Sequence, residues 1–464
     1  TAYEIPKRDW SSDVCSSDLH VAVASVRFAL GALSADSGYT SLDRVWEGSF
    51  YLWARTATAL VGTLLVYVVY RIGLRWNVRA GLIAAFFAAV HPEIVREAHF
   101  ALTDTPLTFW VTLTLLLSMI AAEQCRVRWF MLAGITAGLA TATKYNGATA
   151  LAVPLTVAII GPGVERRAGA MVAAAGGFLG AFFAGAPFSL LDLPEFLKGF
   201  GHLAASYNQR VSVFEMADRY FTYTRNSFSF GLGGWLNYLG WPALLCSLIG
   251  AIAMLVRATS PARRAAAAGA LVFGLGYYWL ISNLSLTYFR YALPVLPLLC
   301  VCLALGIVAV ADFAAGKLTA TNARRAAFGL LALLAVPPLW QATTFDQSRR
   351  QVTTQELTGR WLERNVPASD WVKMEEETLL SPPGYRWEST HQLARESMQS
   401  YIDQGFKYVV VSGAKLSAAR ESNNRHDLAS YQQLFSSSTL MMTIQASADR
   451  PGPTLTILKL PSRQ

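Results

Sequence analysis

The stretch ALPVLPLLCVCLALGIVAVA, residues 292–311, carries no charged side chain and shows no alternation of polar and apolar residues. A helix of about 20 residues spans the roughly 30 Å hydrocarbon core of a bilayer. A strand of a membrane barrel would be shorter and would alternate, so this stretch predicts a transmembrane helix. Over all 464 residues, 53% are hydrophobic and only 15% are charged. This composition is too apolar for a soluble enzyme and predicts an all-α polytopic membrane protein.

Similar apolar segments occur on both sides of this stretch. They predict about ten transmembrane helices within residues 20–345. The ten segments are 51–70, 80–91, 106–122, 129–143, 147–162, 168–188, 233–256, 266–283, 292–311 and 326–342.

The formal charge of +9 comes mostly from basic residues in short loops between apolar segments, which indicates membrane topology and no nucleic-acid partner. The positive-inside rule places these loops in the cytoplasm and places 92–104, 144–146, 189–231, 284–291 and the tail after residue 345 outside. The basic loops contain Arg71, Arg75 and Arg79; Arg126 and Arg128; Arg166 and Arg167; Arg257, Arg263 and Arg264; and Lys317, Arg324 and Arg325.

Both ends of the chain differ from the apolar middle. Residues 1–19 are polar and lack the features of a signal peptide. Their segment KRDWSSDVCSSDL resembles translated adapter sequence, so we expect a non-native leader; the alternative is a disordered natural tail. Residues 346–464 contain a helical pattern, TQELTGRWLERNVP, and two strand patterns, KYVVVSG and PTLTILKL, which predict a small extracytoplasmic α/β domain.

Other features of the sequence predict packing and surface contacts. The pairs Gly134 with Gly138 and Gly176 with Gly180 have the spacing that lets membrane helices approach closely. Residues 191–230 interleave aromatic and charged side chains, which favours an amphipathic helix and loop at the outer interface. The five cysteines form no CxxC pair, so neither a disulfide framework nor a zinc site is predicted.

Polar residues concentrate in the outer stretch HPEIVREAHFALTDTPLTFW, residues 91–110. On a continuous helix Glu93, Glu97 and Asp104 would share one face, able to hold a cation or accept a proton. Pro106 disfavours helical geometry at the preceding residue, so we expect a break. For Asp104 the alternative role is to cap the helix that begins near Pro106, and His99 and Arg96 are alternatively a packed histidine and a surface ion pair.

Two further cations are predicted on the same outer side. Lys144 lies in LATATKYNGA between two apolar segments, and Arg290 lies in LTYFRYALPVLP. A lysine at such a position either extends to the interface, is paired, or binds an anion. Together with Arg96, these cations suit an anionic headgroup at the membrane surface.

These three motifs, in this order, resemble those of glycosyltransferase family 39, the C-type membrane fold shared by protein O-mannosyltransferases and the lipid A aminoarabinose transferase. The resemblance covers about residues 20–345. It implies transfer of a sugar from a polyprenyl phosphate to a lipid, glycan or protein acceptor on the outer side of a bacterial plasma membrane. It assigns catalytic roles to Asp104 and His99, and a divalent metal ion such as Mg²⁺ or Mn²⁺ is a possible cofactor. It assigns substrate binding to Arg96, Lys144, Tyr145, Arg290 and Tyr291.

The chain departs from the family at its start. Members carry a first helix and an outer loop with an acidic motif where this chain has the leader, and Asp36, Asp43 and Glu47 form no convincing motif. We therefore expect the chain as written to be catalytically incomplete.

Two other classes of function remain open from the sequence. In a lipid or polysaccharide transporter or flippase the same outer charges would gate an anionic substrate, and internal repeats or paired broken helices would be expected. In a structural membrane-assembly subunit the soluble tail would bind partners through exposed apolar patches.

Overall fold

The computed structural model describes residues 50–207, 212–229, 240–284, 289–376, 386–421, 424–447 and 449–461. The predicted leader, 1–19, and the acidic residues Asp36, Asp43 and Glu47 lie outside the described residues. The chain divides into two compact units, Thr1–Ala342 and Thr343–Gln464. Each unit is described by itself.

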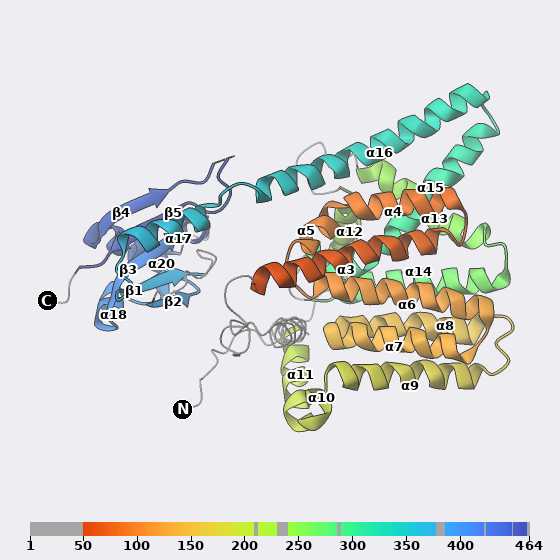
Figure 1. The fold of residues 1–464 in the computed structure, drawn as a ribbon, viewed down its shortest axis with the longest axis horizontal. Coiled ribbons are helices and arrows are strands. Elements are labelled where there is room, and N and C mark those ends of the chain that lie inside the picture. Colours follow the sequence, from red (N-terminus) through yellow and green to blue (C-terminus); the bar gives the residue numbers. More distant parts are fainter. Residues whose placement is uncertain are drawn as a thin grey trace, which may run out of the picture. The chain divides into compact units, whose positions relative to one another are not determined.

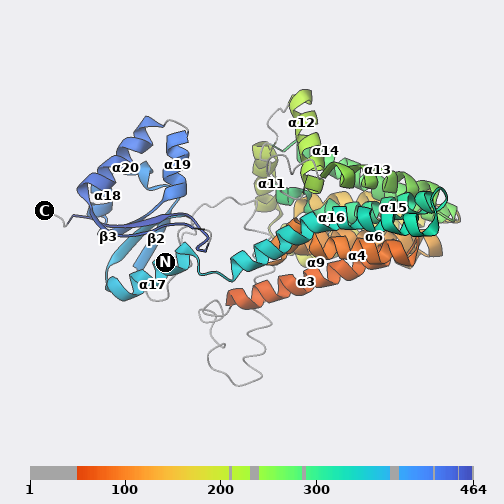
Figure 2. The ribbon, with the colours of Figure 1, turned by 90° about the horizontal axis from the view of Figure 1, so that it is seen from above.

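The first unit is a bundle of helices whose long members run nearly side by side (Figures 1 and 2). Its helices are α3 (Phe50–Gly73), α4 (Val78–Val90), α5 (Pro92–Ala98), α6 (Asp104–Gln124), α7 (Val127–Thr143), η2 (Tyr145–Leu151), α8 (Ala152–Ile160), α9 (Arg167–Gly185), α10 (Phe188–Leu191), α11 (Leu193–Tyr207), α12 (Val213–Ser229), α13 (Gly240–Val256), α14 (Pro261–Ser282), η4 (Phe289–Val295), α15 (Leu296–Ala315) and α16 (Ala320–Arg349). The mostly helical membrane fold predicted from the composition is confirmed.

The described part of each of the ten predicted apolar segments is mostly helical, although 147–162 and 292–311 each combine a 3-10 helix with an α-helix, and residues 233–239 lie outside the described residues. Among the described residues six helical segments are long and apolar enough to cross a membrane, or seven if the bent pair α4 and α5 is one span. The helices α7 and α13, with 17 residues each, lie at the lower limit of about 17 residues for a crossing. The chain is therefore an integral, multi-pass membrane protein.

The arginine-rich loops lie at one end of the bundle, at the right of Figure 1, which we call the basic end. Glu123, near the end of α6, forms ion pairs with Arg75 after α3 and with Arg263 in α14. A second acid, Asp312 of α15, pairs with Arg79 at 3.3 Å and with Arg257 at 2.7 Å. These ion pairs bring together loops that the positive-inside rule had placed on one side.

Close helix contacts in the bundle depend on glycine. A methyl group added to Gly134 or Gly138 of α7 would lie 2.0 or 2.3 Å from backbone oxygens of α9, so no larger residue fits there. The prediction of close packing is wrong for Gly176 and Gly180, because nothing lies within 4 Å of an added methyl group at either. Their neighbour Gly177 makes the contact instead, since its added methyl would lie 2.5 Å from the Met131 carbonyl oxygen.

The helices α4 and α5 meet at a bend of 57°. His91 forms the joint: its Nδ1 accepts from the Glu93 amide at 3.3 Å, and its Nε2 lies 3.2 Å from the carbonyl oxygen of Ser227 in α12. The Ser227 hydroxyl in turn lies 2.7 Å from the Tyr278 hydroxyl of α14. Residues 191–230, predicted as an amphipathic helix and loop, include the helices α11 and α12, and this network fixes α12 to the bundle.

The second unit is a five-stranded sheet covered by helices on both faces (Figure 2). The strand order is β2-β1-β3-β5-β4, with β1 parallel to β2 and β3 and with β5 antiparallel to β3 and β4. Its elements are α17 (Thr354–Asn365), β1 (Trp371–Glu375), β2 (Arg386–Thr390), η5 (Leu393–Arg395), α18 (Met398–Asp403), β3 (Phe406–Ser412), α19 (Gly413–Glu421), α20 (Arg425–Ser437), β4 (Thr439–Ile444) and β5 (Leu455–Lys459). The predicted helix and both predicted strands correspond to α17, β3 and β5.

Candidate functional site

An ion pair between Asp104 and Lys144 lies at the end of the bundle opposite the basic end, which we call the site end. The Lys144 Nζ donates to Asp104 Oδ1 at 2.8 Å. The Asp104 side chain is only 5% exposed, and that of Lys144 is 20% exposed. Charges removed from water to this degree are costly unless paired, so the two positions depend on each other. The two residues, 40 positions apart in sequence, thus lie together, in agreement with their predicted position on one side of the membrane.

The ends of two antiparallel helices position this pair. Asp104 is the first residue of α6, where the partial positive charge of a helix N-terminus stabilises a carboxylate. Lys144 directly follows α7, where the C-terminus favours a cation. The interpretation of Asp104 as a helix cap is wrong, because Thr103 occupies the capping position and no side chain caps this helix. The carboxylate is engaged by Lys144 instead.

Two aromatic residues and an amide surround the pair. The Lys144 Nζ lies 4.9 Å from the centre of the Tyr291 ring, so η4 supplies a face on which the ammonium rests. The Asn146 Nδ2 in η2 donates to the hydroxyl of Tyr277 at 2.7 Å. Tyr277 belongs to α14, is fully buried, and lies close enough to Asp104 to interact with it electrostatically.

The helix α5 carries a second group of charges. Arg96 pairs with Glu93 at 2.7 Å and with Glu97 at 2.9 Å. The ring nitrogen Nδ1 of His99 lies 2.7 Å from the Val95 carbonyl oxygen of the same helix. Because α5 ends at Ala98 and α6 begins at Asp104, the continuous acidic face does not form. The break expected from Pro106 at the preceding residue is wrong in its position, because Thr105 is already helical and Pro106 lies in the first turn of α6.

The other two predicted substrate-binding residues occupy different surroundings. Arg290 lies in η4, directly before Tyr291, and is partly buried. Tyr145 is partly buried, and its ring packs edge-on against Phe196 at 6.1 Å and Phe200 at 5.7 Å between ring centres. It therefore connects the lysine segment to the amphipathic helix α11.

The described residues do not assemble a metal site, since none of their His, Cys, Asp and Glu side chains gather in groups of three or more suited to a metal ion. The acids that the structure does bring together, Glu93 and Glu97, are both occupied by Arg96.

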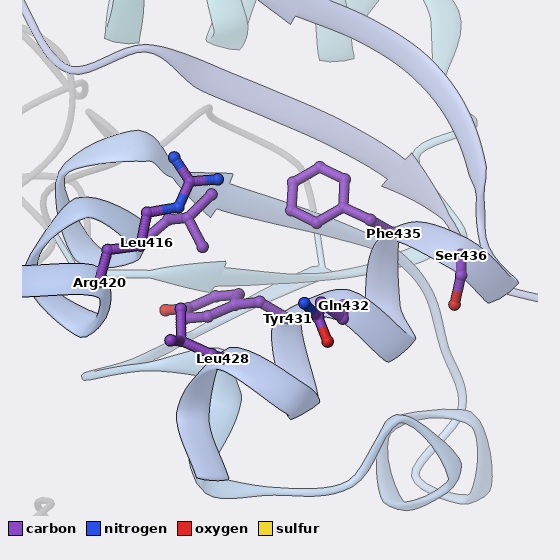
Figure 3. A pocket seen from close by; sticks show the side chains of 7 residues that line it. All are labelled: Leu416, Arg420, Leu428, Tyr431, Gln432, Phe435 and Ser436. Carbon is purple, nitrogen blue, oxygen red and sulfur yellow. The ribbon is translucent and has the colours of Figure 1, made fainter. Parts of the chain in front are cut away.

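The second unit contains an open groove of about 670 Å³ between α19 and α20 (Figure 3). It is lined by Leu416, Arg420, Leu428, Tyr431, Gln432, Phe435 and Ser436. Below it, buried Glu375 accepts hydrogen bonds from the Tyr431 hydroxyl at 2.5 Å and from the Leu393 and Ser412 amides at 2.9 and 2.7 Å. Burial raises the pKa of Glu375 although these bonds oppose the rise. The carboxylate joins β1 to the surrounding loops and helices and does not face the groove as a free group.

The sequence analysis missed Asn146 and Tyr277. Asn146 lies within the quoted motif LATATKYNGA, two residues after Lys144, so its position beside the lysine was the signal that could have identified it. Tyr277 lies inside an apolar helix and nothing in its local sequence distinguishes it from a packing residue.

Comparisons with known proteins give a family-model match over part of the chain and solved structures with a similar fold. The family model "Dolichyl-phosphate-mannose-protein mannosyltransferase" matches residues 49–190, which contain Asp104, Lys144 and Asn146. The structure of ArnT from Cupriavidus metallidurans bound to undecaprenyl phosphate is similar with a TM-score of 0.54 and 16% identity, covering 94% of this chain and 87% of that one. The apo structure of the same ArnT gives a TM-score of 0.52 and 15% identity, covering 95% and 87%. No curated protein matches the sequence significantly. The family-model match agrees with the resemblance of residues 49–190 to glycosyltransferase family 39, and the similarity to ArnT shows that this chain shares its fold.

Proposed function

We propose that this chain is a membrane glycosyltransferase that moves a sugar from a polyprenyl-phosphate donor to an acceptor on the extracytoplasmic side. The observation that carries the proposal is the buried Asp104–Lys144 pair at the end of the bundle opposite the arginine-rich loops. The family-model match over this region and the ArnT fold, solved with undecaprenyl phosphate, support it.

The charges suit the leaving group of such a reaction. When the bond between the sugar C1 and the phosphate oxygen breaks, its electron pair goes to the phosphate, whose charge rises from about −1 to −2. Lys144 lies where it can stabilise this added charge, and Arg290 is the second candidate cation. Tyr291, beneath the ammonium, restricts where the cation can move.

Asp104 is the candidate proton acceptor. The acceptor hydroxyl forms the new bond to C1 and loses its proton, and a carboxylate within the site can receive it. Neutralising Asp104 in this way removes the partner of Lys144 and leaves the ammonium to pair with the phosphate dianion. Proton transfer and stabilisation of the leaving group are then coupled through one ion pair.

A transporter is the competing function. It would be expected to have discontinuous helices in related pairs. Among the described residues one pair of helices, α4 and α5, forms an apolar segment that is bent at a short break, as a discontinuous membrane helix would be. This single break has a local role, since His91 uses it to hold α12. The structure therefore favours the transferase.

The test is to incubate two versions of the protein, the chain as written and a version whose residues 1–19 are replaced by the N-terminal region recovered from its source, with a panel of undecaprenyl and dolichyl phosphates carrying radiolabelled mannose, glucose or aminoarabinose. Protein-dependent loss of sugar from one member is expected for the recovered version, with less for the chain as written. Right-side-out and inverted membrane vesicles then locate the acceptor side, with transfer expected only when an impermeant acceptor is added to the outer face. Flipping of the lipid without release of its sugar would show a transporter instead.

A further inference from the structure

The carboxamide of Asn146 donates a hydrogen bond through its nitrogen, and its buried oxygen is left open. Its Nδ2 donates to the fully buried Tyr277 hydroxyl at 2.7 Å. Tyr277 is itself fixed in α14, where its ring packs at 5.6 Å from that of Phe273. The Asn146 Oδ1 is buried and has no hydrogen-bond partner among the described residues. A buried acceptor without a donor costs about 1 to 3 kcal/mol, so a bound molecule that supplies a donor would be favoured there.

The chemistry of an amide oxygen limits what this molecule can offer. An amide oxygen accepts hydrogen bonds and does not donate them. A phosphodiester at neutral pH carries acceptor oxygens and no donor, so it would be repelled. Hydroxyl and amino groups are the donors that a phosphate-linked sugar provides, and they fit.

We propose that Asn146 binds the sugar of the donor through a hydroxyl or amino group, while Lys144 binds its phosphate. This inference rests on the proposed function and adds a division of labour within it. Lys144 and Asn146 are two residues apart in sequence, so neighbouring side chains would bind the phosphate and the sugar ring attached to it. Tyr277 acts as a positioning residue, because it holds the amide and does not itself contact the sugar.

The proposal is tested by binding, which needs no turnover. Detergent-purified full chain is titrated with sugar-free undecaprenyl phosphate and with the same lipid carrying mannose, glucose or aminoarabinose. Asn146→Leu is expected to weaken binding of the best sugar-loaded lipid about tenfold, the factor that corresponds to about 1.4 kcal/mol. Binding of the sugar-free lipid should change less than about twofold. Lys144→Met should weaken binding of both lipids.

Two variants control for structural damage. Asn365→Leu changes an exposed asparagine of the second unit and should leave both affinities unchanged. Tyr277→Phe removes the hydroxyl that holds the Asn146 amide but leaves the amide in place. We expect a smaller loss of affinity, again only for the sugar-loaded lipid. This second variant keeps the test decisive if Asn146→Leu does not fold.

Three outcomes would overturn the assignment. Equal weakening of both lipids by Asn146→Leu and by Tyr277→Phe would show a purely structural role. No change for either lipid would show that water alone satisfies the amide oxygen. If the wild-type chain binds neither lipid, the proposed function is wrong and the Asn146 assignment is wrong with it. If the wild-type chain binds both lipids and the Asn146 and Tyr277 variants bind them equally well, only the Asn146 assignment is wrong.

Discussion

The two ends of the helix bundle both contain partly buried ion pairs, but they pair their charges differently. At the basic end each acid has two arginines: Glu123 meets Arg75 and Arg263, and Asp312 meets Arg79 and Arg257. At the site end Asp104 has a single lysine. Arginine offers several fixed donors, whereas a lysine is a flexible point charge on a long stem.

This difference distinguishes a structural ion-pair cluster, which we call a clasp and which holds helices together, from a pair that can bind a ligand. Two arginines around one carboxylate satisfy most of its acceptor positions and join helices distant in sequence, as Glu123 joins α6 to α14 and the loop after α3. The single Asp104–Lys144 pair leaves capacity for a further ligand, and the open oxygen of Asn146 lies in the same segment as the lysine. Among the described residues, the buried oxygen of Asn146 has no hydrogen-bond partner, whereas neither Glu123 nor Asp312 has a buried oxygen without one.

The largest effect is expected from Lys144→Met. Transfer should fall by about 10² or more, because a cation that stabilises charge in the transition state is lost. The variant should also lose about 3 to 5 kcal/mol of stability, since Asp104 remains buried without a partner. Thermal unfolding in detergent and sugar release from the labelled donor measure the two effects separately.

The double variant Asp104→Asn with Lys144→Met distinguishes the two roles of the pair. It removes both charges, so most of the lost stability should return while transfer stays at the level of the single variant. Recovery of transfer together with stability would mean that the pair is only a clasp, like those at the basic end.

The sequence predicted the fold more fully than the site. Apolar runs and basic loops were sufficient to predict a mostly helical membrane fold and to group the arginines, because both signals are local and the membrane imposes them. They did not settle the number of spans, since six or seven helical segments among the described residues are long and apolar enough to cross a membrane. Asp104 and Lys144 were found from polar residues at helix ends. Their pairing required the antiparallel contact of α6 and α7, which no local pattern encodes.

Residues that act through tertiary contacts could not be predicted from the local sequence. Tyr277 looks like any aromatic of an apolar helix until α14 brings its hydroxyl to Asn146. Helix contacts show the same limit: Gly176 and Gly180 have the expected spacing, but the rotation of α9 turns Gly177 toward α7. Spacing identifies a possible close contact, and the packing of neighbours decides which glycine makes it.

A smaller effect is expected from Glu123→Gln at the basic end. The two arginines then face each other without a carboxylate, but both remain partly exposed and can be solvated. We expect a loss of about 1 to 2 kcal/mol, between the values for exposed pairs and for charged hydrogen bonds. Sugar transfer per folded molecule should stay within about twofold of the wild type. A loss of transfer as large as that of Lys144→Met would remove the distinction between the two ends.

The smallest effect is expected from Asp312→Asn. Its side chain is 37% exposed, and its partners Arg79 and Arg257 are 68% and 43% exposed, so solvent and salt already screen these pairs. We expect about 0.5 kcal/mol or less, shrinking further as the ionic strength is raised from about 0.05 to 0.5 M. Unfolding of Asp312→Asn and Glu123→Gln at both salt concentrations is the measurement, with wild type as the reference. The more buried Glu123 should keep most of its effect in high salt, because screening acts mainly on exposed charges. If Asp312→Asn cost more than Glu123→Gln at either salt concentration, burial would not govern the strength of these clasps, and the contrast drawn with the more deeply buried Asp104 would lose its physical basis.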